Sequence, residues 1–318
     1  ATTYIYTLSL HDALPISHAV IIGMTGSGKT GLGISMLEEA AIDNIPVIAI
    51  DPKGDLANIA LTFPELKAED FRPWVNPQEA TNRGLSREDY AASQAALWQN
   101  GLADWGQDGS RIARLRSASD VVVYTPGSSS GRGVSVLRSF DAPGEALRAD
   151  FDAYRDMVQS TVTGLLTLVG LDVDPLVGRE HILLANVFEA AWTEGRSLGL
   201  ADIVAAIQAP PFTRIGVMDL DAFYPARDRF ALAMRLNSLL ASPGFKSWLE
   251  GEPLDVNGFL YGTDGKARVS VFSIAHLSDS ERMFFVTMLL NELIAWMRSQ
   301  PGTGSLRALL YMDRSEEH

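Results

Sequence analysis

The chain has 318 residues, of which 47% are hydrophobic, and both values suit one large α/β domain or a core with an inserted domain. It contains no cysteine, which excludes a disulfide framework and a thiolate metal site. Its formal net charge of −13 argues against a surface that is basic all over, although a few Lys and Arg residues can still form a local basic face.

No stretch has the composition of a membrane span. The most apolar segment, residues 283–297, is interrupted by Asn291 and Glu292, two side chains that are costly in lipid but suit the polar edge of a packed helix. The lack of cysteine is also compatible with a reducing cytosol. We therefore expect a cytoplasmic protein.

Both ends of the chain differ in character from the rest. Residues 1–16 are a poor signal peptide, because they lack a basic n-region and a small-residue cleavage site. They closely resemble the peptide that arises when a sequencing adapter is translated, and residues 314–318 look like the same kind of read-through. We therefore expect both segments to be non-native, and the residues from Ser17 to Asp313 to be a fragment of a longer protein.

A glycine-rich stretch near the start matches the phosphate-binding loop pattern G-x-x-x-x-G-K-[ST] at every fixed position. An apolar run at 19–22 precedes it, and apolar residues at the spacing of one helix face follow it. Lys29 is expected to reach the β- and γ-phosphates, and the Thr30 hydroxyl to bind Mg²⁺. The predicted ATP-binding residues are Gly23, Met24, Thr25, Gly26, Ser27, Gly28, Lys29 and Thr30.

Residues 47–50 form a continuous apolar run rich in β-branched side chains, which predicts a strand buried on both faces. A polar turn, residues 51–55, follows at the carboxyl end of this strand, the edge at which open α/β sheets bind ligands. Two interpretations stay open here. Either Asp51 or Lys53 approaches a phosphate or a partner, or the segment is a solvated turn.

Residues 64–118 are polar and predict one or two surface helices, around Arg87–Leu102 and Ile112–Arg116. Tryptophan and arginine residues are interleaved along this stretch, a composition that suits nucleic-acid contact. Acidic residues of similar number accompany the arginines, so ordinary helix docking is the favoured interpretation. The residues that raised the question are Trp74, Trp98, Trp105, Arg111, Arg114 and Arg116.

The next elements predict a strand and then a set of helices. Residues 121–124 suit a buried strand. Helical spacing begins near residue 150 and recurs in four successive segments with no strand between them, which indicates a helical insertion. His181 lies in this part without a second ligand residue nearby, so it is expected to pack and not to bind metal. We expect core residues 17–140, insertion residues 141–257 and core residues 258–313.

Strand patterns return at Phe259–Tyr261 and at 267–274, and Asp264-Gly265 between them predicts a hairpin. A capping box, Ser278 to Glu281, then opens a predicted helix from Asp279 to Ser299. His276, which precedes this helix, could sense a nucleotide, although no other residue supports that role.

The last apolar run, residues 306–312, ends in Asp313. A strand that ends in aspartate is the Walker B arrangement, in which the carboxylate holds Mg²⁺ through water opposite the hydroxyl of the phosphate-binding loop. Together with Gly23–Thr30 it predicts an α/β fold of the P-loop NTPase class, with a mostly parallel sheet, a helical insertion, and ATP and Mg²⁺ as cofactors.

These motifs, with Ile50–Asp55 and Ala275–Asp279, resemble those of the HerA/FtsK group of P-loop motor ATPases, especially bacterial HerA-like proteins. The resemblance covers essentially all of Ser17–Asp313. It implies a RecA/ASCE-like fold, ATP-driven DNA translocation by a homo-hexameric ring and, for HerA itself, a nuclease partner. By the same resemblance Lys29 and Asp313 would be catalytic, and Thr30 and Asp313 would hold the metal.

The chain departs from the family pattern after Asp313. Family members place a glutamate there that activates the attacking water, whereas this chain has Arg314. The later sensor strand, which lies next to the phosphate-loop strand in this family's sheet, and an arginine finger are also absent from the sequence. We therefore expect the 318-residue chain to bind ATP weakly and to hydrolyse it negligibly.

Three functions remain open for the parent protein. The first is an ATP-hydrolysing DNA translocase or helicase, and the second is a conjugation or secretion ATPase. The third is a non-catalytic ATP-binding module that acts as a regulatory switch. A small-molecule kinase is disfavoured, because the insertion and the late Walker B strand offer no evident acceptor site.

Overall fold

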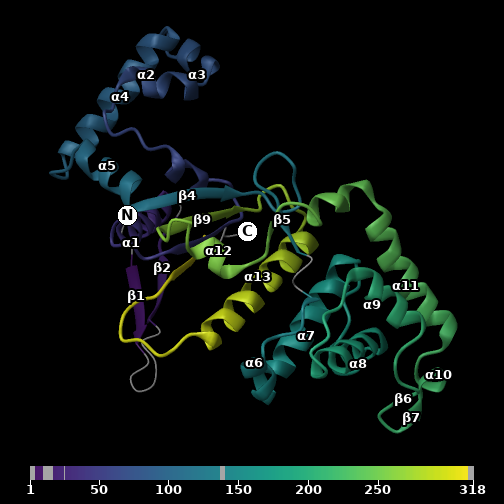
Figure 1. The fold of residues 1–318 in the computed structure, drawn as a ribbon. Coiled ribbons are helices and arrows are strands. Elements are labelled where there is room, and N and C mark those ends of the chain that lie inside the picture. The colour runs from purple at the N-terminus through teal and green to yellow at the C-terminus, as the bar shows by residue number, and fades with distance from the viewer. Residues whose placement is uncertain (1–3, 10–16, 25, 137–139, 314–318) are drawn as a thin grey trace.

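The computed structural model describes residues 4–9, 17–24, 26–136 and 140–313 (Figure 1). Its centre is a four-stranded parallel sheet in the order β10-β3-β9-β4. The strands are β10 (Leu309–Met312), β3 (Val47–Asp51), β9 (Ala267–Ser273) and β4 (Ser119–Tyr124). The fold is therefore α/β with a mostly parallel sheet, as the sequence predicts.

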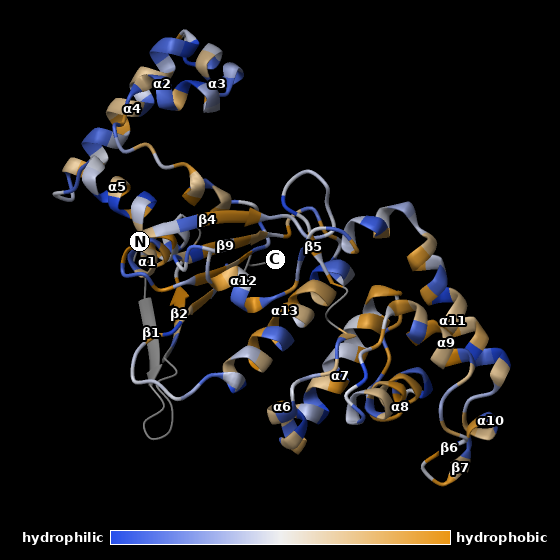
Figure 2. Cartoon of the chain, in the orientation of Figure 1, coloured by the Kyte–Doolittle hydropathy of each residue, from blue (hydrophilic) through white to orange (hydrophobic). Residues whose placement is uncertain are grey.

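Both faces of the sheet are covered, which explains the continuous apolar runs of its strands. All five residues of β3 are buried. On one face Val47 and Ala49 pack with helix α1 (Lys29–Ile42) and the short 3₁₀ helix Leu56–Ala60. Figure 2 shows β4 changing from hydrophilic to hydrophobic along its length, as its sequence Ser-Asp-Val-Val-Val-Tyr requires.

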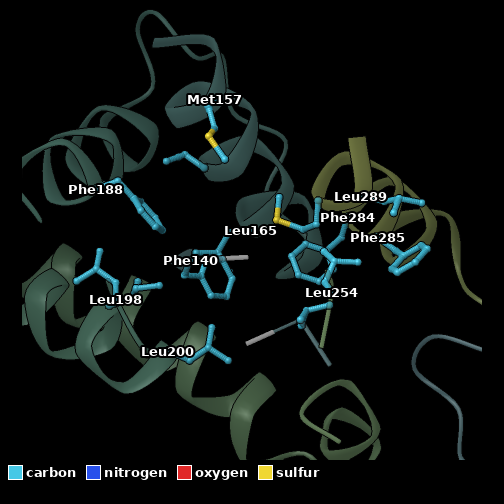
Figure 3. Close-up of a cluster of buried hydrophobic side chains, with 14 of the residues drawn as sticks. Phe140, Met157, Leu165, Phe188, Leu198, Leu200, Leu254, Phe284, Phe285 and Leu289 are labelled. Atoms are coloured by element: carbon cyan, nitrogen blue, oxygen red, sulfur yellow. The ribbon is translucent and has the colours of Figure 1, made fainter. Parts of the chain in front are cut away.

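The opposite face of the sheet belongs to the larger hydrophobic cluster, which also includes helix α13 (Asp279–Ser299) and the helical insertion. Each fully buried Leu or Phe side chain contributes about 1.5–3 kcal/mol to stability. Figure 3 shows part of this cluster, where aromatic rings from α13 face the insertion. Its labelled members are Phe140, Met157, Leu165, Phe188, Leu198, Leu200, Leu254, Phe284, Phe285 and Leu289.

Helix α13 begins where the capping box predicts. Ser278 Oγ accepts a hydrogen bond from the backbone of Glu281 at 3.4 Å, and the Glu281 carboxylate accepts one from the backbone of Ser278 at 2.9 Å. The helix then runs for 21 residues. In the part of the chain that is described, no helix is both long and apolar enough to cross a membrane.

The strand that leads into the phosphate-binding loop lies outside the central sheet. This strand, β2 (Ser17–Ile22), pairs antiparallel with β1 (Tyr4–Ser9). Val20 and Ile22 are each 51% exposed. The predicted order of strand, loop and helix is confirmed. Residues 10–16 and 314–318 lie outside the described residues, so the non-native origin of both ends stays a prediction.

An arm of short helices follows β3 and projects from the sheet (Figure 1). Its two longer helices, α4 (Arg87–Ala103) and α5 (Gly109–Ala118), confirm the helices expected here. Two shorter ones, α2 (Ala68–Phe71) and α3 (Pro77–Asn82), precede them. Tyr90 of α4 helps to form a small separate core. The arm leaves Trp74, Trp98 and Trp105 exposed.

The insertion consists mainly of helices, as predicted. The long ones are α7 (Phe151–Leu168), α8 (Arg179–Thr193), α9 (Leu200–Gln208) and α11 (Ala226–Ala241), with α6 (Glu145–Ala149) and α10 (Leu220–Phe223) as short additions. The expectation that no strand separates them is wrong, since β6 (Arg214–Ile215) and β7 (Met218–Asp219) form a small hairpin between α9 and α10. A second two-residue pair joins β5 (Val134–Ser135) to β8 (Glu252–Pro253).

His181 of α8 is fully buried, and its Nε2 lies 3.0 Å from Thr163 Oγ1, so it packs inside the insertion as expected. No group of three or more His, Cys, Asp or Glu residues suited to a metal occurs among the described residues. The domain boundaries at residues 141 and 257 stay a prediction.

The strand predicted at Phe259–Tyr261 is wrong. Residues Val256–Leu260 form helix α12, because Asp255 caps its start by accepting a bond from the Asn257 backbone at 3.3 Å. Phe259 lies in this helix and its side chain is buried. Of the expected hairpin, only an isolated antiparallel bridge between Tyr261 and Ala267 is present. The physical reason is that an aspartate four residues before an apolar pair supports a helical turn as well as a strand.

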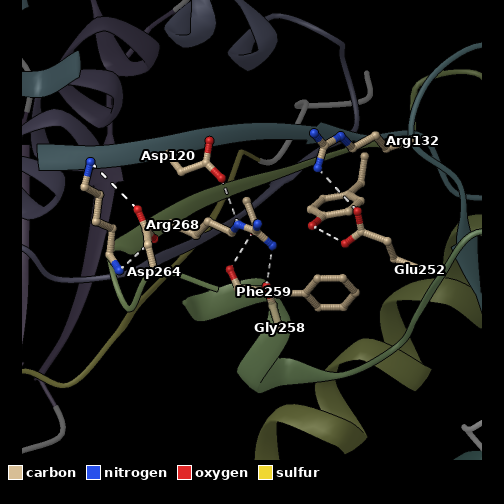
Figure 4. A network of polar contacts seen from close by, with 10 residues as sticks. Asp120, Arg132, Glu252, Gly258, Phe259, Asp264 and Arg268 are labelled. Atoms are coloured by element: carbon tan, nitrogen blue, oxygen red, sulfur yellow. Dashed lines mark hydrogen bonds and ion pairs between the residues drawn. The ribbon is translucent and has the colours of Figure 1, made fainter. Parts of the chain in front are cut away.

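A polar network holds α12 against the sheet (Figure 4). Arg268 of β9 donates to Asp120 of β4 at 3.1 Å and to the Gly258 carbonyl of α12 at 2.8 Å. Nearby, the hydroxyl of Tyr124 donates to Glu252 at 2.9 Å, and burial raises the pKa of that phenol to about 12. The network lies toward the β4 side of the sheet, while the predicted nucleotide site lies at the β10 side.

Candidate nucleotide-binding site

The phosphate-binding loop joins β2 to α1 with glycines where the backbone turns sharply. Gly26 has φ 78° and Gly28 has φ 90°, the left-handed region that glycine tolerates best. Gly28 is the N-cap of α1, where no side chain caps the helix and no acidic residue stands in its first turn. The helix therefore presents its first N–H groups and positive dipole end to an anion. Thr25, a predicted binding residue, lies outside the described residues.

Lys29 folds back over its own loop. Its ammonium donates to the carbonyl of Gly23 and, at 3.1 Å, to that of Met24. Both acceptors are neutral carbonyls, and a phosphate would instead offer the Lys29 ammonium an acceptor of opposite charge. The donor set of the loop thus fits a polyphosphate.

Two residues from opposite ends of the sequence meet beside the loop. Thr30 Oγ1 donates to Asp313 Oδ2 at 3.3 Å, although the residues are 283 positions apart. Asp313 directly follows β10, its backbone N–H donates to the carbonyl of Ile50 at 3.3 Å, and its side chain is only 12% exposed. A hydroxyl and a carboxylate are hard oxygen ligands of the kind that Mg²⁺ prefers, so the pair fits that ion.

Asp51 and Lys53, which the sequence left undecided, take different positions. The Asp51 carboxylate is fully buried and faces inward, where it accepts from the backbone of Gly54 at 2.7 Å and of Leu56 at 3.0 Å. It therefore holds the turn and does not face a ligand. Lys53 points toward the end of β10, and its Nζ lies 3.8 Å from Asp313 Oδ1.

Residues 12–207 match the family model described as Helicase HerA, central domain. The chain belongs to this family. The match includes the phosphate-binding loop, the turn after β3 and the insertion as far as α9. No curated protein and no solved structure matches the chain. Membership and the parallel sheet together identify a P-loop ATPase of HerA/FtsK type with an ATP-binding motor domain.

Sequence reasoning missed one pair that brings α1 close to β10. Gly33 is buried in α1, and a Cβ placed on it would overlap the ring of Tyr311 of β10. Burial, and then the charges of Asp313 and Asp51, raise the pKa of Tyr311 to about 12, so the phenol stays neutral against the helix. A second glycine inside a helix that begins at a phosphate loop is the signal that could have revealed the pair.

His276 is not brought to this site. Its Nε2 lies 2.9 Å from the carbonyl of Pro126, just beyond β4. Since β4 and β10 are opposite edges of the sheet, this contact points away from Thr30 and Asp313. The structure therefore gives no support to a nucleotide-sensing role for His276.

Proposed function

We propose that this chain is the ATP-binding part of a DNA translocase or helicase of HerA type. The observation that carries the proposal is the contact between Thr30 and Asp313, which joins the phosphate-binding loop to a carboxylate at the end of a parallel strand. That pairing is what Mg²⁺-dependent nucleotide binding requires of a P-loop protein.

Each residue has a distinct proposed role. The first N–H groups of α1 and the Lys29 ammonium would bind the phosphates, and Thr30 and Asp313 would hold Mg²⁺. When bound, Mg²⁺ would neutralise phosphate charge and fix the orientation of the nucleotide. Gly33 and Tyr311 keep α1 and β10 at the separation at which Thr30 and Asp313 meet.

Hydrolysis needs a group that orients or deprotonates water, and this chain places Arg314 after Asp313. We therefore propose that the chain binds ATP weakly and turns it over negligibly. The same residue favours a second candidate, an ATP-binding regulatory module. A glutamate after Asp313 in the parent protein, with DNA-stimulated hydrolysis, would support the translocase, and a genuine arginine without hydrolysis would support the module.

DNA, a homo-hexameric ring and a nuclease partner are proposed from family membership alone. The exposed arginines of α5, Arg114 and Arg116, have no ion-pair partner among the described residues, and they lie on the two sides of the buried Leu115. Weak binding of duplex DNA that disappears at high salt and in a double Ala variant of this pair would support contact there.

The nucleotide site is tested by titrating ATP with Mg²⁺ into the chain and into Lys29→Ala. Loss of a charge-assisted contact of about 1.5–3 kcal/mol should weaken ATP binding about ten- to hundredfold. Lys266→Ala is the matched control, since Lys266 is an exposed lysine that pairs with Asp264. Equal affinities for all three proteins would refute the site. Turnover above that of Lys29→Ala would refute the proposed inactivity.

A further inference from the structure

We infer that Lys53 is a second phosphate-binding lysine, which contacts the terminal phosphate and makes the site prefer ATP over ADP. The inference rests on the proposed nucleotide site and deepens it, since neither the loop pattern nor the family match assigns Lys53 a role. Its basis is the position of this lysine at the carboxyl edge of the sheet, in the turn that follows β3, the strand next to β10 and Asp313.

The turn that carries Lys53 is held by the carboxylate of Asp51. The buried oxygens of Asp51 accept the backbone N–H groups of four consecutive residues, Lys53 to Leu56, at 2.7 to 3.2 Å. Gly54 has φ 86°, which permits the tight turn. The backbone of Lys53 is thus fixed relative to β3, while its side chain remains 38% exposed and able to reach a ligand.

Asp313 divides its oxygens between two partners. Oδ2 accepts from Thr30 at 3.3 Å, and Oδ1 lies 3.8 Å from the Lys53 ammonium. Lys53 therefore places a positive charge next to Asp313, the carboxylate that would hold the metal in the proposed site. Two lysines thus approach one site from different elements, Lys29 from the loop, where it bonds to Gly23 and Met24, and Lys53 from the end of β3.

If Asp313 held a divalent cation, the like charges would favour a position of the Lys53 ammonium farther from Asp313. Because the backbone of Lys53 is fixed, its ammonium stays at the same edge of the sheet. There it would contact the terminal phosphate of the nucleotide. Lys53 then gains this contact with ATP and lacks it with ADP. In the nucleotide-free protein it competes with the metal for Asp313.

The test measures dissociation constants for ATP and ADP, with Mg²⁺, for the chain, Lys53→Ala, Lys53→Arg and the control Lys266→Ala. Lys53→Ala should weaken ATP binding about tenfold and leave ADP binding within about twofold, because one charge-assisted contact is lost. Lys53→Arg should keep most of the preference for ATP, and Lys266→Ala all of it. Thermal melts confirm that each variant is folded.

A second measurement uses no nucleotide. Mg²⁺ alone is titrated while the melting temperature is followed, and Lys53→Ala should shift the midpoint to lower Mg²⁺ concentration, because Asp313 has lost its competing cation. A midpoint unchanged from that of the parent chain would overturn the competition between Lys53 and the metal.

The outcomes separate this inference from the proposed function. If Lys29→Ala weakens binding and Lys53→Ala leaves ATP and ADP unchanged, or weakens both equally, the role of Lys53 is wrong and the nucleotide site stands. If Lys29→Ala binds ATP as tightly as the unaltered chain, the site itself is wrong and the inference fails with it.

Discussion

The buried carboxylate of Asp51 allows a direct test of how the site is supported. Both of its oxygens are withdrawn from solvent, and they accept four backbone N–H groups of the following turn. Replacing Asp51 with Ala removes every acceptor of this set at once. The turn would then lose its shape and, with it, the fixed position of Lys53 beside Asp313.

The expected cost follows from the four bonds. The one from Leu56 is buried and the other three are partly buried. A buried donor left unsatisfied costs about 1–3 kcal/mol, and each partly buried donor costs less because water can reach it. We expect Asp51→Ala to lower the free energy of unfolding by about 3–5 kcal/mol, and Asp51→Asn, which keeps one acceptor oxygen, by about 1–3 kcal/mol.

Urea unfolding followed by tryptophan fluorescence measures this difference, provided that the m-values agree. Asp55→Ala is the matched control, because Asp55 stands in the same turn with an exposed side chain and should change stability by less than about 0.5 kcal/mol. Should Asp51→Ala unfold within about 1 kcal/mol of the unaltered chain, the turn does not depend on this carboxylate and the anchoring of Lys53 is refuted.

Two further predictions concern packing and pH. Gly33→Ala should lower the melting temperature, because the new methyl group meets the Tyr311 ring. The control Gly31→Ala has open space around it and should leave the melting temperature unchanged or raise it. Equal effects of the two substitutions would contradict the close packing of α1 on β10. Burial lowers the pKa of His181, so the unfolded chain binds its proton more readily than the folded one, and the stability this histidine supports at pH 7.5 is lost as the pH falls below about 6.5. Unfolding free energies at pH 7.5 and 5.5 should differ less in His181→Gln than in the unaltered chain, and an equal difference would contradict this assignment.

Local sequence signals predicted several elements because their causes are themselves local. The capping box from Ser278 to Glu281 satisfies the first N–H groups of α13 whatever lies around it. The apolar run of β3 predicts burial on both faces, and the glycine loop before Lys29 predicts an anion site. In each case the signal itself lies in residues that are neighbours in the chain.

Local signals failed where two structures suit the same residues. Phe259 and Leu260 are apolar in either a strand or a helix, and burial against α13 and β9 settles them as part of α12. Likewise the run before the phosphate loop does form strand β2, but pairing decides that it lies outside the central sheet. Periodicity cannot distinguish these outcomes, since short apolar runs match both patterns.

The sequence by itself determined the α/β class, the phosphate-binding loop and the strand-end aspartate, because each depends on residues within one turn or one strand. Only the tertiary structure brought Thr30, Asp313 and Lys53 together and turned Asp51 inward to hold the turn. The physical reason is that parallel strands from distant parts of the chain end at one edge of the sheet, so their terminal residues become neighbours through pairing and not through spacing in the sequence.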